Sequence, residues 1–103
     1  MQCRLPAVIL VSLLLGTTAT YSSLADSAKG SQLAQQWCAS CHVTSSSRAR
    51  SAQEGPPSFR TIASTRTAAQ LRAFLSHPHG AMPDLSLTRA EIDDLIGYIE
   101  TLR

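Results

Sequence analysis

The stretch Trp37-Cys38-Ala39-Ser40-Cys41-His42 decides how the rest of the chain is interpreted. Its pattern, Cys-x-x-Cys-His, is typical of covalent haem attachment. On a helix or in a tight turn, residues three apart face the same way, so Cys38 and Cys41 can each add to one vinyl group on the same edge of a haem. His42 follows at once and can bind the iron as the proximal ligand. The stretch therefore predicts one haem c, held through two sulfur atoms.

Three other uses of this cysteine spacing have less support. A zinc site needs two further ligands at metal spacing, and the other cysteine of the chain, Cys3, stands near its start. A thioredoxin-like dithiol accompanies a βαβ pattern, which the sequence lacks. A disulfide between Cys38 and Cys41 would close a very small loop and constrain little of the unfolded chain.

Residues 1–25 differ in kind from the rest and predict a secretory signal peptide. Arg4 precedes an apolar run from Leu5 to Leu15, and Ser23-Leu24-Ala25 has small residues where a cleavage site needs them. The run is about half as long as a bilayer requires, so an uncleaved membrane anchor is the alternative. Cys3 precedes the run and is interpreted as incidental. Export fits haem attachment, which needs reduced thiols outside a membrane, and in a bacterium this predicts the periplasm.

Residues 26–103 are expected to form one all-α domain. Without Arg4, eight basic and seven acidic residues remain, a net charge near +1, too small to indicate nucleic acid or a membrane surface as partner. A domain of fewer than eighty residues is at the edge of what an apolar core can stabilise alone. A haem supplies a large apolar body around which three to four short helices can pack.

Apolar spacing and capping patterns predict where these helices lie. The expected helices span residues 26–41, a short turn at 59–62, a segment from Thr67 that ends before His77-Pro78, and 88–102. Capping boxes open the last two, at Thr67 and at Thr88. Leu71, Phe74 and Leu75 are expected on one apolar face of the third helix. The helix over 88–102 is strongly amphipathic, with Tyr98 near the edge of its apolar stripe, and needs a partner, which the first helix can supply. Gly30 in the first helix is either a close-approach position or a frayed one.

Residues 76–87 form an expected loop that contains Met82, the one methionine after the predicted signal. A thioether is a soft ligand that raises the reduction potential of haem iron when it is paired with histidine. With a haem motif already present, Met82 is the expected distal ligand, and Pro83 would stiffen its loop. His77 and His79 compete for the position and would give iron of lower potential.

Residues 43–58 read as another loop, which ends in Gly55-Pro56-Pro57. A metal-bound histidine usually donates its second ring N–H to a carbonyl or carboxylate, which fixes its tautomer. The Pro57 carbonyl is the expected acceptor for His42, and the segment also fits a rigid turn.

Arg48 and Arg50 are interpreted as solvated, with docking of an acidic partner as the alternative. Trp37 is expected to pack rather than to touch a partner.

With these residues in hand, the chain resembles the class I c-type cytochromes, small monohaem electron carriers with His/Met iron. The resemblance covers residues 28–103 and rests on Gly30, Cys38 to His42, Pro57-Ser58-Phe59, Ala81-Met82-Pro83 and Asp94-Leu95-Ile96-Gly97-Tyr98-Ile99. It implies the cytochrome c fold, thioether bonds at Cys38 and Cys41, His42 and Met82 as axial ligands, and Pro57 as acceptor. It also implies that Gly30 and Tyr98 lie where the first and last helices cross. Two departures are Ala34, where the family commonly has an aromatic residue, and the missing lysine-rich face, of which only Lys29 is present.

These observations predict a periplasmic carrier of single electrons that exchanges them with redox proteins. No side chain has the surroundings of a general acid, a base or an activated nucleophile, so neither catalysis nor a small-molecule substrate is expected. A membrane would be a partner only if the signal stayed uncleaved. Two alternatives stay open: a haem subunit of a larger dehydrogenase or oxidase complex, and a haem peroxidase or sensor if Met82 binds iron weakly.

Overall fold

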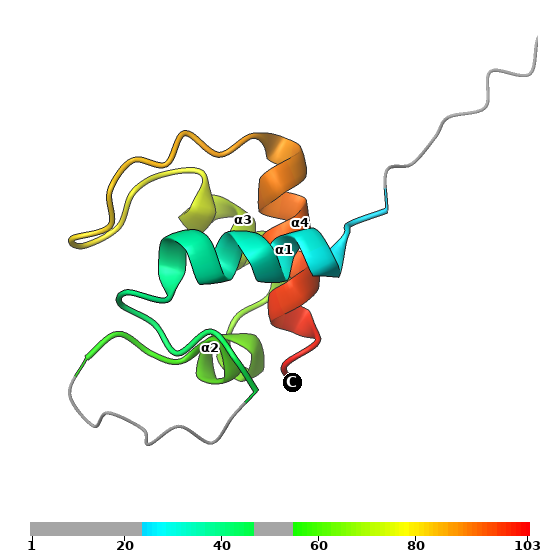
Figure 1. Cartoon of the computed structure of the whole chain (residues 1–103), viewed down its shortest axis with the longest axis horizontal. Helices are drawn as coiled ribbons and strands as arrows, with labels where there is room; N and C mark the ends of the chain where they lie inside the picture. Colours follow the sequence, from blue (N-terminus) through cyan, green and yellow to red (C-terminus); the bar gives the residue numbers. More distant parts are fainter. Residues whose placement is uncertain (1–23, 47–54) are drawn as a thin grey trace, which may run out of the picture.

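The computed structural model describes residues 24–46 and 55–103, which form an all-helical fold (Figure 1). The predicted signal peptide falls outside the described residues except for Leu24 and Ala25, as do Arg48 and Arg50. No strand occurs in the described ranges. Five helical segments follow one another within these two ranges: α1 (Ser27–Leu33), η1 (Ala34–Cys38), α2 (Phe59–Thr65), α3 (Ala68–Leu75) and α4 (Arg89–Glu100). The expected class, a few short helices, is confirmed.

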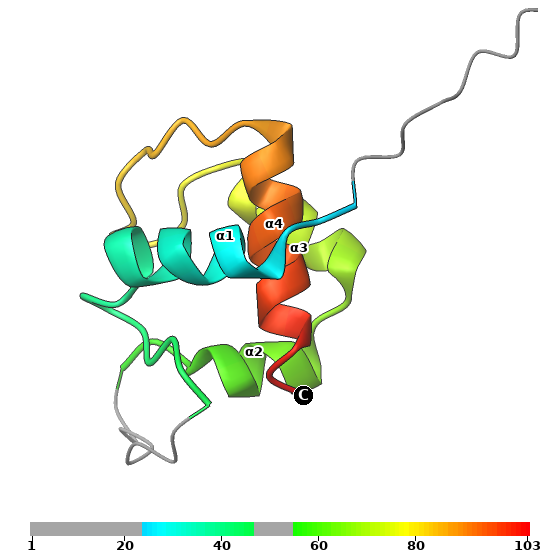
Figure 2. The same cartoon turned by 45° about the vertical axis from the view of Figure 1, so that its right-hand side comes forward.

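The fold is organised by the crossing of α1 over α4, which is visible in two orientations (Figures 1 and 2). Gly30 is buried at this crossing, and a Cβ atom added there would overlap the carbonyl of Asp94 and lie 2.8 Å from the Cβ of Tyr98. The backbone N–H of Asp26 donates to the Asp94 carboxylate at 2.6 Å. Gly30 is therefore a close-approach position, because no side chain fits between the helices.

The core lies where α4 meets the other helices. Leu95 and Ile99 are fully buried on the apolar stripe of α4, as its period of 3.6 residues predicted. Ala34 is also fully buried, so a small side chain fills the position at which the resembling family commonly has an aromatic one. The remaining members of the core are Phe59, Ala63, Leu71, Ile92, Ile96 and Leu102.

Both predicted capping boxes are confirmed. Thr67 and Gln70 exchange side-chain and backbone hydrogen bonds at the start of α3, and Thr88 and Glu91 do the same at the start of α4. The helix α3 ends at Leu75, two residues before His77-Pro78. At the start of α2, the hydroxyl of Ser58 accepts from the backbone N–H of Thr61 at 3.1 Å.

The first helix differs from its prediction at its C-terminal end. Residues 26–41 were expected to be one α-helix, but the α-helical part ends at Leu33 and η1 continues it as a π-helix to Cys38. The N–H of Ala39 reaches back five residues to the carbonyl of Ala34 at 3.0 Å. Such segments are rare and often lie at functional sites. Here the wider turn leads directly into the two cysteines.

Candidate haem site

The two cysteines and His42 lie in one tight turn, in which two backbone N–H groups share the Cys38 carbonyl as acceptor. The N–H groups of Cys41 and His42 donate to the carbonyl of Cys38 at 3.1 and 2.9 Å. Both cysteines are free thiols, with Cys41 exposed and Cys38 half-buried. Burial raises the pKa of the Cys38 thiol above its ordinary value, and the neighbouring Cys41 adds to the rise. Cys38 is therefore a protonated thiol at neutral pH.

The imidazole of His42 is fixed by the segment that precedes α2. Its Nδ1–H donates to the carbonyl oxygen of Pro57 at 2.7 Å, which is the contact expected from the sequence. The N–H of Phe59 donates to the carbonyl of Val43 at 2.9 Å and holds the two segments together. The ring of Phe59 lies against His42, with 5.6 Å between the ring centroids. With Nδ1 engaged, Nε2 is the nitrogen left to bind a metal.

The last helix also supports this segment. The hydroxyl of Tyr98 donates to the carbonyl of Thr44 at 2.6 Å, and Thr44 is buried. Tyr98 thus ties α4 to the chain two residues after His42. The sequence placed Tyr98 at the edge of the apolar stripe but gave no partner for its hydroxyl, because the contact joins residues 54 positions apart.

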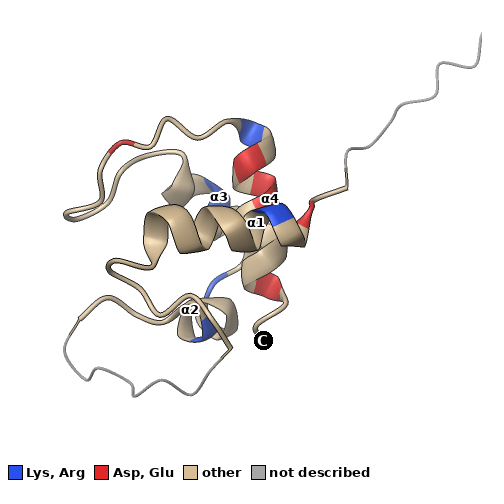
Figure 3. Ribbon diagram, in the orientation of Figure 1, with Lys and Arg blue, Asp and Glu red and all other residues tan. Residues whose placement is uncertain are grey.

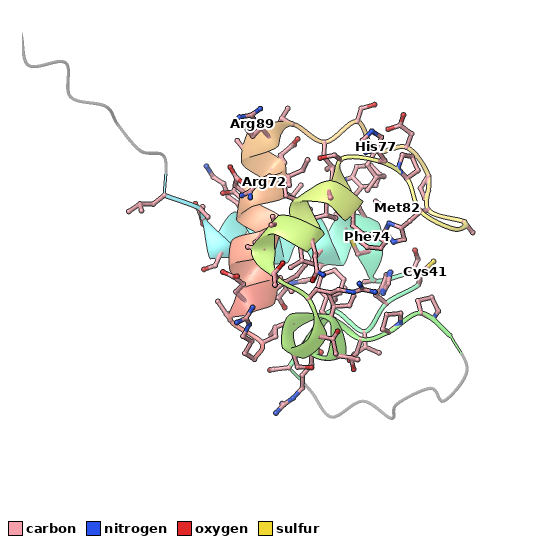
Figure 4. All side chains as sticks on the ribbon, turned by 180° about the vertical axis from the view of Figure 1, so that it is seen from behind. Cys41, Arg72, Phe74, His77, Met82 and Arg89 are labelled. Carbon is pink, nitrogen blue, oxygen red and sulfur yellow. The ribbon has the colours of Figure 1, made fainter. Side chains whose placement is uncertain are left out.

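The loop between α3 and α4 carries Met82. In Figures 1 and 2 this loop lies on the same side of the molecule as the turn of Cys38 to His42. Met82 is half-buried, and its backbone N–H donates to the carbonyl of His79 at 2.9 Å. It borders a cavity of about 60 Å³ together with residues from both limbs of the loop, among them Leu75, Leu85 and Leu87. In Figure 4, Met82 lies along the same edge as Cys41 and Phe74.

The two histidines of the loop differ in their position. His77 is exposed, whereas His79 is half-buried and its ring centroid lies 6.5 Å from that of His42. The ring of His79 also packs edge-on against the ring of Phe74, with 5.6 Å between the ring centroids. These contacts bring the 76–87 loop up to His42, and they single out His79 as the loop histidine near the site.

Two aromatic side chains are more exposed than the sequence predicted. Phe74 was placed on the apolar face of α3, but it is 45% exposed and contacts His79 on one side and the Arg66 guanidinium, at 5.2 Å, on the other. Trp37, which was expected to pack, is 48% exposed. Both residues leave apolar surface uncovered by the described protein, on or near the segments that carry Cys38, His42 and Met82.

Charged side chains are absent from the segments that form the site. Residues 30–46 and 73–83 contain no Lys, Arg, Asp or Glu. Figure 3 shows the charged residues of the described ranges on α4, α2, α3, the start of α1 and the far limb of the loop. These two segments are called the uncharged border of the site; the charged residues Arg66, against Phe74, and Asp84, at the cavity beside Met82, lie just outside it.

The donor set fits haem c. Two free thiols lie next to an imidazole whose Nδ1–H is held by a carbonyl, a thioether lies on the facing loop, and aromatic rings border the histidines. Within residues 24–46 and 55–103, no three His, Cys, Asp or Glu side chains gather as a metal cluster would require, so the zinc alternative has no support there. Thiols, imidazole and thioether are the groups by which proteins hold a c-type haem.

The fold and this donor set define a small c-type cytochrome, an electron-transfer protein with covalently bound haem c. The chain belongs to the family described as cytochrome c oxidase, cbb3-type, subunit III, whose model matches residues 25–99. It is 35% identical over 105 residues to a cytochrome c-552 from Bradyrhizobium diazoefficiens, across 100% of this chain and 99% of the relative. No solved structure matches the chain.

Proposed function

We propose that this cytochrome is a periplasmic carrier of single electrons with one haem, attached through Cys38 and Cys41 and ligated axially by His42 and Met82. The observation that carries the proposal is the hydrogen bond of 2.7 Å from the His42 Nδ1–H to the Pro57 carbonyl, beside two free thiols. It holds the proximal histidine as a metal-bound imidazole is held.

Covalent attachment follows from the chemistry of the thiols. Cys38 and Cys41 would hold the haem by thioether bonds, each of which corresponds to net addition of one S–H group across one vinyl double bond and consumes no oxidant. Cys38 and Cys41 are three residues apart in one turn, which suits the spacing of two vinyl groups on one porphyrin edge.

Bound haem supplies the one-electron couple at its iron, and the chain sets the conditions for it. Pro57 orients His42 and makes its Nε2 a better donor. Met82 supplies a neutral, soft sulfur that favours the reduced state. Phe59, against His42, and Phe74, against His79, would supply apolar surface to the bound haem. With both axial positions filled, the protein would carry electrons without a substrate of its own.

The periplasm is the proposed location of this cytochrome. The predicted signal in residues 1–25 directs export, and c-type haem is attached outside a membrane. Within the described residues, no helix has the length and apolar character needed to cross a bilayer. The partners would be redox proteins that approach the uncharged border formed by residues 30–46 and 73–83.

The test is expression in a host competent for haem maturation, followed by mass spectrometry of the denatured protein. The expected mass is that of residues 26–103 plus one haem, and the double variant Cys38→Ala/Cys41→Ala should retain none. The ferric spectrum should show the weak long-wavelength band of methionine–iron ligation. Met82→Ala should abolish the band, and Leu85→Ala, a half-buried neighbour on the same loop, should keep it. Colourless wild-type protein would refute the proposal.

A second candidate is a haem subunit of a larger oxidase or dehydrogenase complex. The description of the matched family, a subunit of an oxidase, favours it. The name of the 35% identical relative, cytochrome c-552, instead fits a small carrier. Size-exclusion chromatography of the native protein separates the two, because a carrier elutes at the mass of one small domain and a subunit elutes with its complex.

A further inference from the structure

His79 lies where a second distal ligand would be placed. Its ring centroid is 6.5 Å from that of His42, with 65° between the ring planes. A metal–imidazole bond is about 2 Å long, so two imidazoles that share one metal have ring centres roughly 6 Å apart. The observed separation thus matches the spacing of two rings on opposite sides of one iron. His77, two residues earlier, is exposed.

We propose that His79 is an alternative distal ligand, which takes the iron when the bond from Met82 breaks. The inference rests on the proposed function, since it needs a haem whose proximal ligand is His42. It adds a second coordination state, in which the iron stays six-coordinate and closed to external ligands. The exchange replaces a bond to sulfur by a bond to nitrogen and transfers neither electrons nor atoms between molecules.

The imidazole of His79 is not held by a hydrogen bond at Nδ1. This atom is buried and has no hydrogen-bond partner in the described part of the chain. Buried polar atoms without partners are uncommon and call for a physical explanation. Its ring contacts Phe74 and His42, and with Nδ1 free of a hydrogen bond the imidazole can rotate to direct a nitrogen at the iron.

The backbone between His79 and Met82 suits an exchange of ligands. The Met82 N–H donates to the His79 carbonyl at 2.9 Å and closes a four-residue turn. Gly80 in this turn has φ of 52°, and a Cβ atom added there would meet nothing within 4 Å. Gly80 and Ala81 are both exposed. Gly80 and Ala81 can therefore change conformation without disturbing packed side chains of their own, which lets the turn present His79 or Met82 to the iron.

The chemistry gives the two ligands different preferences. Sulfur stabilises reduced iron, whereas a second imidazole nitrogen stabilises the ferric state and lowers the reduction potential. Met82 is the one methionine in residues 26–103, so oxidation of its thioether to the sulfoxide would remove the sulfur ligand selectively. We expect His79 to occupy the position after such damage.

The test compares ferric spectra, potentials and cyanide binding in a set of variants. Met82→Ala should stay low-spin, lose the long-wavelength band and have a lower potential. Met82→Ala/His79→Ala should be high-spin and bind cyanide at least about tenfold faster, since no internal ligand competes. Met82→Ala/His77→Ala is the matched control and should stay low-spin. His79→Ala alone should keep the band of wild type.

A second measurement needs no substitution at position 82. Wild-type protein treated with a mild methionine oxidant should become low-spin without the band, and His79→Ala treated in the same way should become high-spin. A high-spin Met82→Ala, or a low-spin Met82→Ala/His79→Ala, would overturn the inference. Loss of covalent haem, or absence of the band from untreated wild type, would instead count against the proposed function.

Discussion

The hydroxyl of Tyr98 donates a hydrogen bond of 2.6 Å to the carbonyl of Thr44, and this contact joins the last helix to the segment that follows His42. The same residue touches the first helix, because the Cβ of Tyr98 faces Gly30. Tyr98 therefore contacts α1 through its Cβ atom, and through its hydroxyl it positions the segment that contains His42 and Thr44.

Tyr98→Phe is expected to lower the free energy of unfolding by about 1–3 kcal/mol, because it leaves the buried carbonyl of Thr44 without a partner. Urea denaturation of the haem-loaded protein, followed by circular dichroism, measures the loss. Glu100→Gln, a change of an exposed side chain on the same helix, should shift the midpoint much less. Equal stability of Tyr98→Phe and wild type would show that the hydrogen bond contributes nothing.

Gly30→Ala is expected to destabilise the protein even though alanine is the better helix former. Alanine gains about 1 kcal/mol in an exposed helix, but its Cβ would overlap the backbone carbonyl of Asp94, which cannot rotate away. Overpacking of this kind typically costs about 1–3 kcal/mol, so the net change should be a loss. Thermal unfolding of the haem-loaded protein checks it.

Gly97→Ala is the matched control for this crossing. A Cβ atom at Gly97 would meet the side chain of Ala25 at 3.0 Å, outside the helices, where the chain can give way. The control should be more stable than Gly30→Ala. A Gly30→Ala protein that melts at or above the wild-type temperature would mean that α1 and α4 can separate without cost.

The sequence predicted the parts of this fold that depend on local rules. The capping boxes at Thr67 and Thr88 and the apolar stripe of α4 are set by residues within one or two turns of each other. The contact between His42 and Pro57 was also foreseen, because the chemistry of a metal-bound histidine demands an acceptor.

Other features follow from tertiary contacts that no local pattern carries. The π-helical segment before Cys38 has no distinctive residue, since Ala34-Gln35-Gln36-Trp37-Cys38 is compatible with an ordinary α-helix. The exposure of Phe74 and the nearness of His79 to His42 depend on how the loop returns across the site. Spacing along the chain could rank His77 and His79 only as equals.

The capping box of α4 should make stability depend on pH. Hydrogen bonds from the backbone and side chain of Thr88 lower the pKa of Glu91 below its ordinary value. Because the folded pKa is lower than the unfolded one, about 4.3, the stabilisation is complete above the unfolded value and is lost as pH falls through the folded pKa.

Glu91→Gln should therefore be less stable than wild type at pH 7, and the difference should shrink toward pH 3. Denaturation of both proteins across this range measures it. Gln70→Ala, which breaks the uncharged capping box of α3, should lower stability by a similar amount at every pH. A pH-independent gap for Glu91→Gln would contradict the role assigned to its carboxylate.

The uncharged border of the site predicts weak dependence of electron transfer on ionic strength. Residues 30–46 and 73–83 contain no Lys, Arg, Asp or Glu, and residues 26–103 have a net charge near +1 with histidine neutral. We expect the rate of reduction by an anionic reagent to change by less than about threefold between low and physiological salt, because steering needs a charged surface near the point of contact.

Ser40, exposed between the two cysteines, offers a matched pair of probes. Ser40→Lys should make the rate fall with salt and Ser40→Glu should make it rise, measured by stopped-flow absorbance. A steep salt dependence in wild type would mean that electrons enter at another, charged face of the molecule.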